Sequence, residues 1–199
     1  MKTYTGKTVD DAVSKACLDL GVTIDQLNYE VTLETKGLFS KKAEIACWTV
    51  EMVQEYIENL IRKILTDMQF EVETVSYVQD GRIYCNINTS NNSILIGKAG
   101  VILRAINLII KNAVSTTFKK RLEVSVDING YKEEKYEKVC ALAKRIARTV
   151  QRSRTDAVLD PMPADERKVM HQEIAKMDHL KTESKGEGKN RYMTISYVD

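Results

Sequence analysis

Cysteine pairs and proline are scarce in this chain. Its 199 residues include only 2 prolines and 4 cysteines, the latter at positions 17, 47, 85 and 140. The cysteines form no Cys-x-x-Cys pair, and no histidine lies close to them in the sequence. This scatter argues against a structural zinc site and against a disulfide framework, and it is typical of a reducing cytosol. We therefore expect no metal, no cofactor and a cytoplasmic location.

Catalytic constellations are also missing. The two histidines, His171 and His179, have no serine or cysteine nucleophile in a motif context around them. The tetrapeptide Gly97-Lys98-Ala99-Gly100 lacks the spacing and the trailing Ser or Thr of a Walker phosphate loop. We expect a non-catalytic protein rather than an enzyme that acts on nucleic acid.

Long apolar runs are the third absence. The opening residues, MKTYTGKTVDDAV, are too polar for a signal peptide. The run Val101–Val114 is shorter than the roughly 18 residues of a membrane span, and Arg104 and Lys111 interrupt it. We expect no membrane insertion.

Acidic side chains are absent from one long segment. Residues 81–122 carry 7 basic and no acidic side chains, whereas residues 1–80 carry 8 basic and 14 acidic ones. The net charge of the whole chain is only +2, so the distribution of charge along the chain indicates more about its partners than the total does. A segment without carboxylates can attract a polyanion, although a buried apolar core combined with chance would give the same count.

Hydrophobic periodicity predicts an α+β chain of three small domains. Residues 1–49 read as a β–α–β–β module, with a helix over 8–20 between a Thr8 cap and a Gly21 stop. Its strands are expected at 29–35 and 41–50, around a turn at residues 36–37.

The second domain is expected over residues 50–130. A helix at 50–69 precedes a hairpin around Asp80-Gly81, formed by strands 71–78 and 82–89. A glycine-bracketed turn, a helix at 100–117 and a strand at 121–128 follow. This order favours a three-stranded sheet with helices on one face.

The third domain is expected over residues 131–199. A long helix at 132–152 precedes a break at residues 161–163 and a short helix opened by acidic residues. Residues 182–198 read as a glycine-containing loop that leads into a terminal strand. The long helix carries Lys144, Arg145, Arg148 and Arg152, and residues 139–155 contain no acid. These cations form either a solvated helix face or a second positive patch.

The glycine-bracketed turn interrupts an otherwise apolar helical stretch. Each glycine inside a helix costs about 1 kcal/mol relative to alanine, so the pattern favours a turn that lets the backbone approach a phosphate. Helix–GxxG–helix motifs hold about four nucleotides of a single strand. We expect Gly97, Lys98, Ala99 and Gly100 to contact phosphate, with Ile96 lining a groove for the bases and Arg104 beside it; a plain helix–helix turn is the alternative.

Arg167 and His171 are four residues apart and share one face of the short helix. Spacing alone favours a solvated arginine and a partly buried histidine over a binding site.

The residues together resemble the Jag family, also called SpoIIIJ-associated proteins, over nearly the whole chain. The segments GKTVDDAVSKACLDLGV and KGLF resemble the Jag N-terminal domain, and ILIGKAGVILRAINLIIKNAV resembles a KH domain of the prokaryotic type. The segments LDPMPADERKVMHQEI and TESKGEGKNRYMTI resemble an R-three-H domain, named for an Arg-x-x-x-His pair that falls on Arg167 and His171.

The resemblance implies that Arg167 and His171 contact nucleic acid. Ser184, Gly186, Gly188, Asn190 and Arg191 match the closing motif of the family, and Arg191 is an expected phosphate contact. It also implies a cytoplasmic protein that binds single-stranded RNA, or single-stranded DNA, and regulates cell elongation, division or sporulation. Its implied partner is a small single-KH protein, or a second copy, bound through the KH domain.

The acidic N-terminal segment supports a different interpretation. An acidic module is a poor surface for RNA. The chain could instead be an adaptor whose N-terminal domain binds a protein, with RNA binding secondary.

Overall fold

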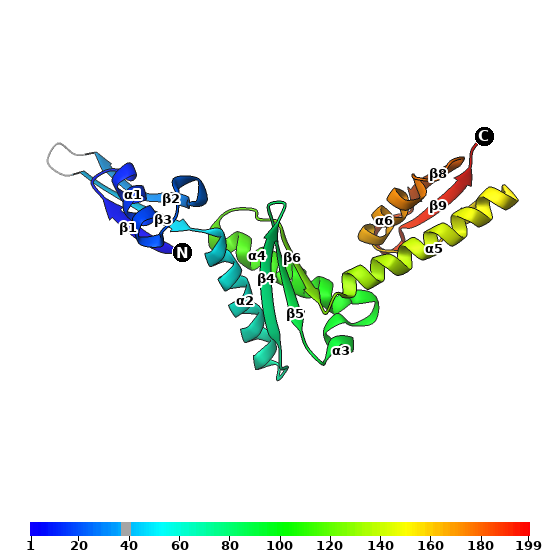
Figure 1. Ribbon diagram of the computed structural model, residues 1–199, viewed down its shortest axis with the longest axis horizontal. Helices are drawn as coiled ribbons and strands as arrows, with labels where there is room; N and C mark the ends of the chain where they lie inside the picture. Colours follow the sequence, from blue (N-terminus) through cyan, green and yellow to red (C-terminus); the bar gives the residue numbers. More distant parts are fainter. Residues whose placement is uncertain (37–40) are drawn as a thin grey trace. The chain divides into compact units, whose positions relative to one another are not determined.

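The chain folds into three small sheets with helices packed against them, so the predicted α+β class is confirmed (Figure 1). The computed structural model describes residues 1–36 and 41–199. It divides into two compact units, Met1–Asn129 and Gly130–Asp199, and the first unit contains two of the sheets.

The first sheet has the strand order β1-β3-β2, with both pairs antiparallel. Its elements are β1 (Lys2–Gly6), α1 (Val9–Leu20), a 3₁₀ turn (Ile24–Gln26), β2 (Asn28–Lys36) and β3 (Lys41–Trp48). The predicted caps of α1 are confirmed: Thr8 accepts a hydrogen bond from the N–H of Asp11, and Gly21 is left-handed with φ 66°. The turn predicted at residues 36–37 and the KGLF match at 36–39 extend outside the described residues.

The second sheet has the order β4-β5-β6 and carries α2 and α4. Its elements are α2 (Val50–Asp67), β4 (Glu73–Gln79), β5 (Arg82–Asn88), α3 (Asn92–Ile96), a 3₁₀ turn (Lys98–Gly100), α4 (Val101–Phe118) and β6 (Val124–Ile128). Asp80 and Gly81 have φ of 50° and 72°, the positive values that a two-residue hairpin of type I′ requires. Because β5 and β6 are parallel, α3, the turn and α4 form the crossover between them.

The side-chain amide of Asn107 fixes α4 to the edge strand β6. Its Oδ1 accepts from the N–H of Val126 and its Nδ2 donates to the C=O of the same residue, both at 2.8 Å. The amide therefore stands where the backbone of another strand would pair.

One helical stretch, Asn92–Phe118, is long and apolar enough to cross a membrane by length and composition. The stretch contains Lys98, Arg104 and Lys111, so it includes no run of about 18 uncharged apolar residues. The stretch is broken by the turn at Gly97–Gly100, and one face of α4 is buried against the sheet through Leu103, Ile110, Val114 and Phe118.

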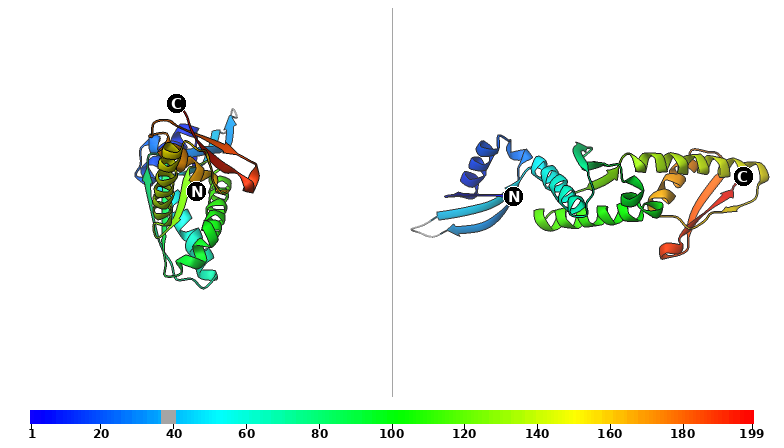
Figure 2. Two further views of the ribbon diagram at one scale, coloured as in Figure 1. Left: turned by 90° about the vertical axis from the view of Figure 1, so that its right-hand side faces the viewer. Right: turned by 90° about the horizontal axis from the view of Figure 1, so that it is seen from below.

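The second unit has its own sheet, of order β7-β9-β8. Its elements are α5 (Tyr131–Ser153), β7 (Ala157–Val158), α6 (Ala164–Ile174), β8 (Leu180–Lys185), a 3₁₀ turn (Gly188–Asn190) and β9 (Tyr192–Tyr197). Figure 2 shows α6 and the β8–β9 hairpin beside α5. The core consists of apolar residues from α5, α6 and β9, namely Val139, Ala143, Ala147, Val150, Met170, Ile174, Met193 and Ile195.

Strand β8 corrects the sequence prediction, which placed a loop from residue 182 onward. Its more buried positions alternate as a strand requires, but two of them are Thr182 and Ser184 rather than apolar residues. Hydrophobic alternation therefore gives no signal for this strand.

Candidate nucleic-acid interface

The turn between α3 and α4 depends on both of its glycines. Gly97 has φ 70° and ψ 173°, and a Cβ at this position would lie 2.7 Å from Cγ1 of Ile102. Gly100 is buried, has φ 75°, and donates its N–H to the carbonyl of Gly97 at 3.0 Å. A larger residue at Gly97 would have to displace Ile102 and adopt a left-handed conformation. The sequence interruption is thus a true backbone turn.

The middle of the turn is exposed and is held by Arg104. Lys98 and Ala99 both project into solvent, and Ala99 is left-handed with φ 52°. Arg104 donates from Nη1 to the carbonyl oxygen of Ala99 at 2.7 Å. Arg104 was predicted as a flanking contact for nucleic acid, and the structure gives it a hydrogen bond that stabilises the turn.

Exposed apolar side chains border the turn. Ile94 is 56% exposed and Val101 is 52% exposed, while Ile102 is also exposed and Ile96 is half-buried. Of these, only Ile96 was predicted from the sequence to line a groove for bases. The signal for Val101 and Ile102 was available, because they lie off the buried face of α4, whereas Ile94 belongs to the short helix α3. Together they form an apolar border beside a backbone turn that is open to solvent.

Some of the cations in the basic segment 81–122 have partners elsewhere in the fold, so fewer of them are available to an anion. Lys119 forms an ion pair with Glu30 at 2.9 Å, and Lys120 donates to Asn28 at 2.8 Å. In the described part of the chain, Lys98 and Lys111 have no such partner. The cations at the C-terminal end of α4 thus contact the N-terminal module, and Lys98 remains available at the turn.

The predicted pair Arg167 and His171 lies in a closed polar network between α6 and β8. Arg167 is only 9% exposed, and its Nη1 donates to Oγ of Ser184 at 2.9 Å. His171 uses both ring nitrogens: Nδ1 lies 2.6 Å from Oγ1 of Thr182 and Nε2 lies 2.9 Å from Oγ of Ser184. The two residues are together, as their spacing predicted, but Arg167 faces inward.

The electrostatics of this network favour a neutral imidazole. Burial and the neighbouring Arg167 guanidinium lower the pKa of His171 below its ordinary value. A neutral ring has one donor and one acceptor nitrogen. In this form the ring can hydrogen-bond to both Thr182 and Ser184. The guanidinium of Arg167 has no acceptor, so in its hydrogen bond with Ser184 it is the donor. The network thus fixes α6 against β8.

The closing turn of the last domain presents Arg191 to solvent. Gly186 has φ 80°, and a Cβ there would lie 2.6 Å from the carbonyl oxygen of Asn190, so glycine is required. The Arg191 carbonyl accepts from the N–H of Met162 at 3.1 Å, which holds the backbone. The Arg191 guanidinium has no partner among the described residues and is free to meet an anion.

Comparison with known proteins places the chain in a family. The Jag N-terminus family matches residues 4–46 and the R-three-H domain family matches residues 137–197. The RNA-binding protein KhpB of Clostridium symbiosum is 30% identical over 202 residues, which cover 98% of this chain and 91% of that protein. The chain belongs to the Jag family. The resemblance to this family found in the sequence is confirmed, with its Jag N-terminal and R-three-H domains.

Two further relatives carry the same protein name. The RNA-binding protein KhpB of Bacillus subtilis (strain 168) is 28% identical over 210 residues, covering 98% of this chain and 97% of that protein. The protein of the same name from Streptococcus pneumoniae serotype 2 is 27% identical over 146 residues, covering 73% of this chain and 44% of that protein. The two matched domains leave the second sheet, with its glycine turn, between them.

Proposed function

We propose that the chain is a non-catalytic protein that binds single-stranded RNA through two surfaces. The first is the glycine turn of a KH domain over residues 50–130, and the second is the R-three-H domain over residues 131–199. The proposed third domain of the chain is a Jag N-terminal domain over residues 1–49. The observation that carries the proposal is the turn itself: its glycines keep the backbone open, and an unpaired Lys98 and an apolar border lie next to it.

The chemistry of the turn suits a sugar-phosphate backbone. Glycines permit close approach of a phosphate, and the start of α4 adds N–H groups and the positive end of the helix dipole. Lys98 supplies a charge, and bases would lie against Ile94, Ile96 and Val101. Because residues 85–117 contain no Phe, Tyr or Trp on which a base could stack, the affinity would rest on phosphate contacts and would fall steeply with salt.

The second surface is formed by the outer side of the polar network. His171 and Ser184 are half-buried and Arg191 is exposed, so these three can reach a ligand, while Arg167 positions Ser184 from within. Two weak surfaces on one chain increase the affinity for a strand that reaches both.

The deciding experiment places two carboxylates on the turn. The double variant Lys98→Asp/Ala99→Asp is compared with Lys63→Asp/Gln69→Asp, which makes the same charge change at exposed positions of the same domain. We expect the affinity for a fluorescein-labelled single-stranded RNA, measured by anisotropy, to fall more than tenfold only in the first, because a charge-assisted contact contributes about 1.5–3 kcal/mol.

The other outcomes are equally informative. Equal affinity of the two double variants would remove the turn from the interface and leave the R-three-H domain as the binding site. A wild-type chain that binds no RNA at low salt would refute the proposed function and favour the adaptor interpretation.

The adaptor interpretation has its own supporting observation. Strand β2 is at the edge of the first sheet and exposes Tyr29, Val31 and Leu33. An apolar edge strand is a surface on which another chain can add a strand. If Val31→Lys/Leu33→Lys abolishes cellular targeting and leaves RNA affinity unchanged, the N-terminal domain is the adaptor.

The finer biological role follows the family. We place the protein in the cytoplasm as a regulator linked to cell elongation, division or sporulation, which gene deletion and cell-length measurement would test. A partner of the single-KH type, or a second copy, would find an apolar surface on α4, where Leu108 is 60% exposed and Ile109 is exposed beside it. Leu108→Glu/Ile109→Glu should then abolish co-purification of that partner.

A further inference from the structure

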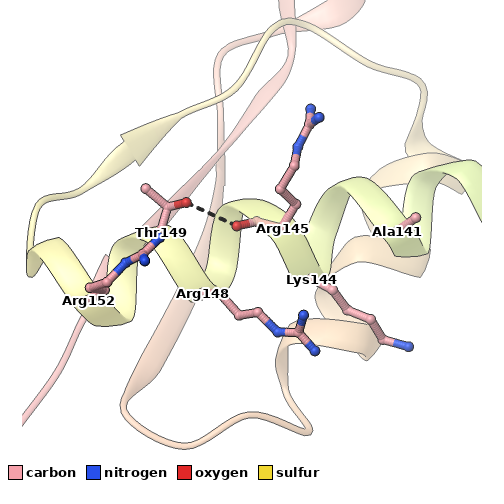
Figure 3. Close-up of a pocket in the computed structure, with 6 residues that line it drawn as sticks. All are labelled: Ala141, Lys144, Arg145, Arg148, Thr149 and Arg152. Atoms are coloured by element: carbon pink, nitrogen blue, oxygen red, sulfur yellow. Dashed lines mark hydrogen bonds between the residues drawn. The ribbon is translucent and has the colours of Figure 1, made fainter.

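The C-terminal half of α5 carries a cationic hollow of about 420 Å³. Figure 3 shows the side chains that line it, all of which come from this one helix: Ala141, Lys144, Arg145, Arg148, Thr149 and Arg152. None of them belongs to the network of Arg167 and His171 or to the glycine turn.

The helix spaces these side chains as a shallow trough. At about 100° per residue, Lys144 and Arg148 fall on one side of Ala141 and Arg145 falls on the other, as the sticks in Figure 3 show. Ala141 is short, so the floor is low and the long cations form the walls. Residues 144, 148 and 152 follow one another at a rise of about 6 Å per step.

The charges of this trough are not neutralised within the fold. In the described part of the chain, the guanidinium groups of Arg145, Arg148 and Arg152 have no hydrogen-bond acceptor or carboxylate partner. Lys144 pairs with Glu173 at 3.1 Å, but that carboxylate also binds Lys176 at 2.8 Å.

The N-terminal half of the same helix is different. Lys135 pairs with Glu166 at 2.6 Å, and Lys138 pairs with Glu134 at 3.6 Å. One helix therefore neutralises its lysines in its first half and leaves its arginines unpaired in its second. A generic solvated helix face would mix both signs along its length.

The composition of the trough selects its ligand. Its lining side chains are cations, alanine and threonine, so its apolar area comes from Ala141, a threonine methyl and alkyl stems, and it has no large apolar side chain to anchor a hydrophobic peptide. Arginine forks match the geometry of phosphate oxygens and bind them in pairs. The opposite face of the helix is buried through Val139, Ala143, Ala147 and Val150, which holds the trough in place.

We propose that this face of α5 binds phosphates of the RNA backbone as a third contact surface of the chain. The proposal rests on the proposed RNA-binding function and adds a site to it. This surface would bind RNA of any base sequence, because phosphate contacts position a strand without distinguishing bases.

The test removes the three unpaired charges. The variant Arg145→Gln/Arg148→Gln/Arg152→Gln is compared with Lys41→Gln/Lys42→Gln/Lys63→Gln, which loses the same charge in the first unit. Anisotropy titrations with labelled single-stranded RNA over a series of salt concentrations give the slope of log K against log salt. We expect the α5 variant to lower the magnitude of this slope by about 2, at ~0.7 per phosphate contact, and the control to leave it unchanged.

Three outcomes separate this proposal from the function it rests on. Equal slopes and affinities for the two triple variants overturn it, and an acidic protein partner for the trough would give that result. If Lys98→Asp/Ala99→Asp loses affinity while the α5 variant behaves like its control, only the α5 site fails. If the wild type binds no RNA, both proposals fail together. Should the triple variant melt early, the single change Arg148→Gln, with an expected slope change of about 0.7, decides the question.

Discussion

Single residues of the last domain connect its proposed binding surface with its architecture. The sequence pattern brought Arg167 and His171 to notice as a pair on one helix face, and the fold adds two hydroxyl groups from β8. Since Arg167 is buried and donates to Ser184, its loss would disturb the surface from within. A loss of RNA affinity in an Arg167 variant could therefore result from a displaced Ser184 as well as from a lost contact between Arg167 and RNA.

His171 should make stability depend on pH. Its folded-state pKa is depressed by burial and by Arg167, whereas the unfolded chain has the ordinary value of about 6.5. As the pH falls below about 6.5, the unfolded state takes up the proton first, so stability present at neutral pH is lost until the folded-state pKa is passed. Urea unfolding at neutral and mildly acidic pH measures the effect. His171→Gln should flatten the dependence and His179→Gln should not; identical profiles for all three proteins would contradict this.

Substitutions at two positions of the glycine turn, 97 and 99, should affect stability differently. Gly97→Ala should destabilise the fold by about 1–3 kcal/mol, because the Cβ meets Ile102 and a left-handed non-glycine residue is strained. Ala99→Gly, at φ 52° in an exposed position, should be neutral or stabilise by up to about 1 kcal/mol, because strain relief opposes the added freedom of the unfolded chain. Denaturant midpoints measure both, and equal losses would be inconsistent with the turn geometry.

At the scale of elements, helices and strands with an apolar face were predictable. The caps of α1, the Asp80-Gly81 hairpin and the long helix α5 follow from local chemistry. Strand β8 was not predictable, because its inward positions are hydroxyls that bind partners on α6. The partners of Lys119 and Lys120 could not be predicted either, because Glu30 and Asn28 on β2 lie far away from them in the sequence.

The contact between α4 and β6 should contribute strongly to stability. Asn107→Leu would remove the partner of both polar backbone groups of Val126, and leaving buried groups unsatisfied costs about 1–3 kcal/mol. Asn112→Leu, at an exposed position of the same helix, is the matched control. Thermal and urea unfolding should show a loss for position 107 alone, and a comparable loss at both positions would mean that the amide contact contributes little.

At the scale of the whole molecule, the chain contains two compact units with separate cores. The second unit, Gly130–Asp199, buries apolar residues from both of its helices and from its central strand β9. Family membership could be read from the sequence because its motifs are local. The separation of cores could only be suspected, because it depends on which apolar faces meet.

The second unit should fold by itself. A fragment of residues 130–199 should unfold cooperatively, and Met170→Ala within it should cost about 2–5 kcal/mol, because the side chain is fully buried in this core. Circular dichroism melting of the fragment and its variant measures both effects. A fragment without a cooperative transition would show that the first unit is needed to complete the fold.

The amide of Asn107 has a consequence for encounters between molecules. A sheet grows into an aggregate when a strand from another chain pairs with an open edge. At β6 the backbone groups of Val126 are already occupied by this side chain, so an incoming strand would have to displace it. The residue that fixes α4 to β6 therefore also protects that edge from the addition of a strand, and replacing it would expose the chain to self-association as well as to unfolding.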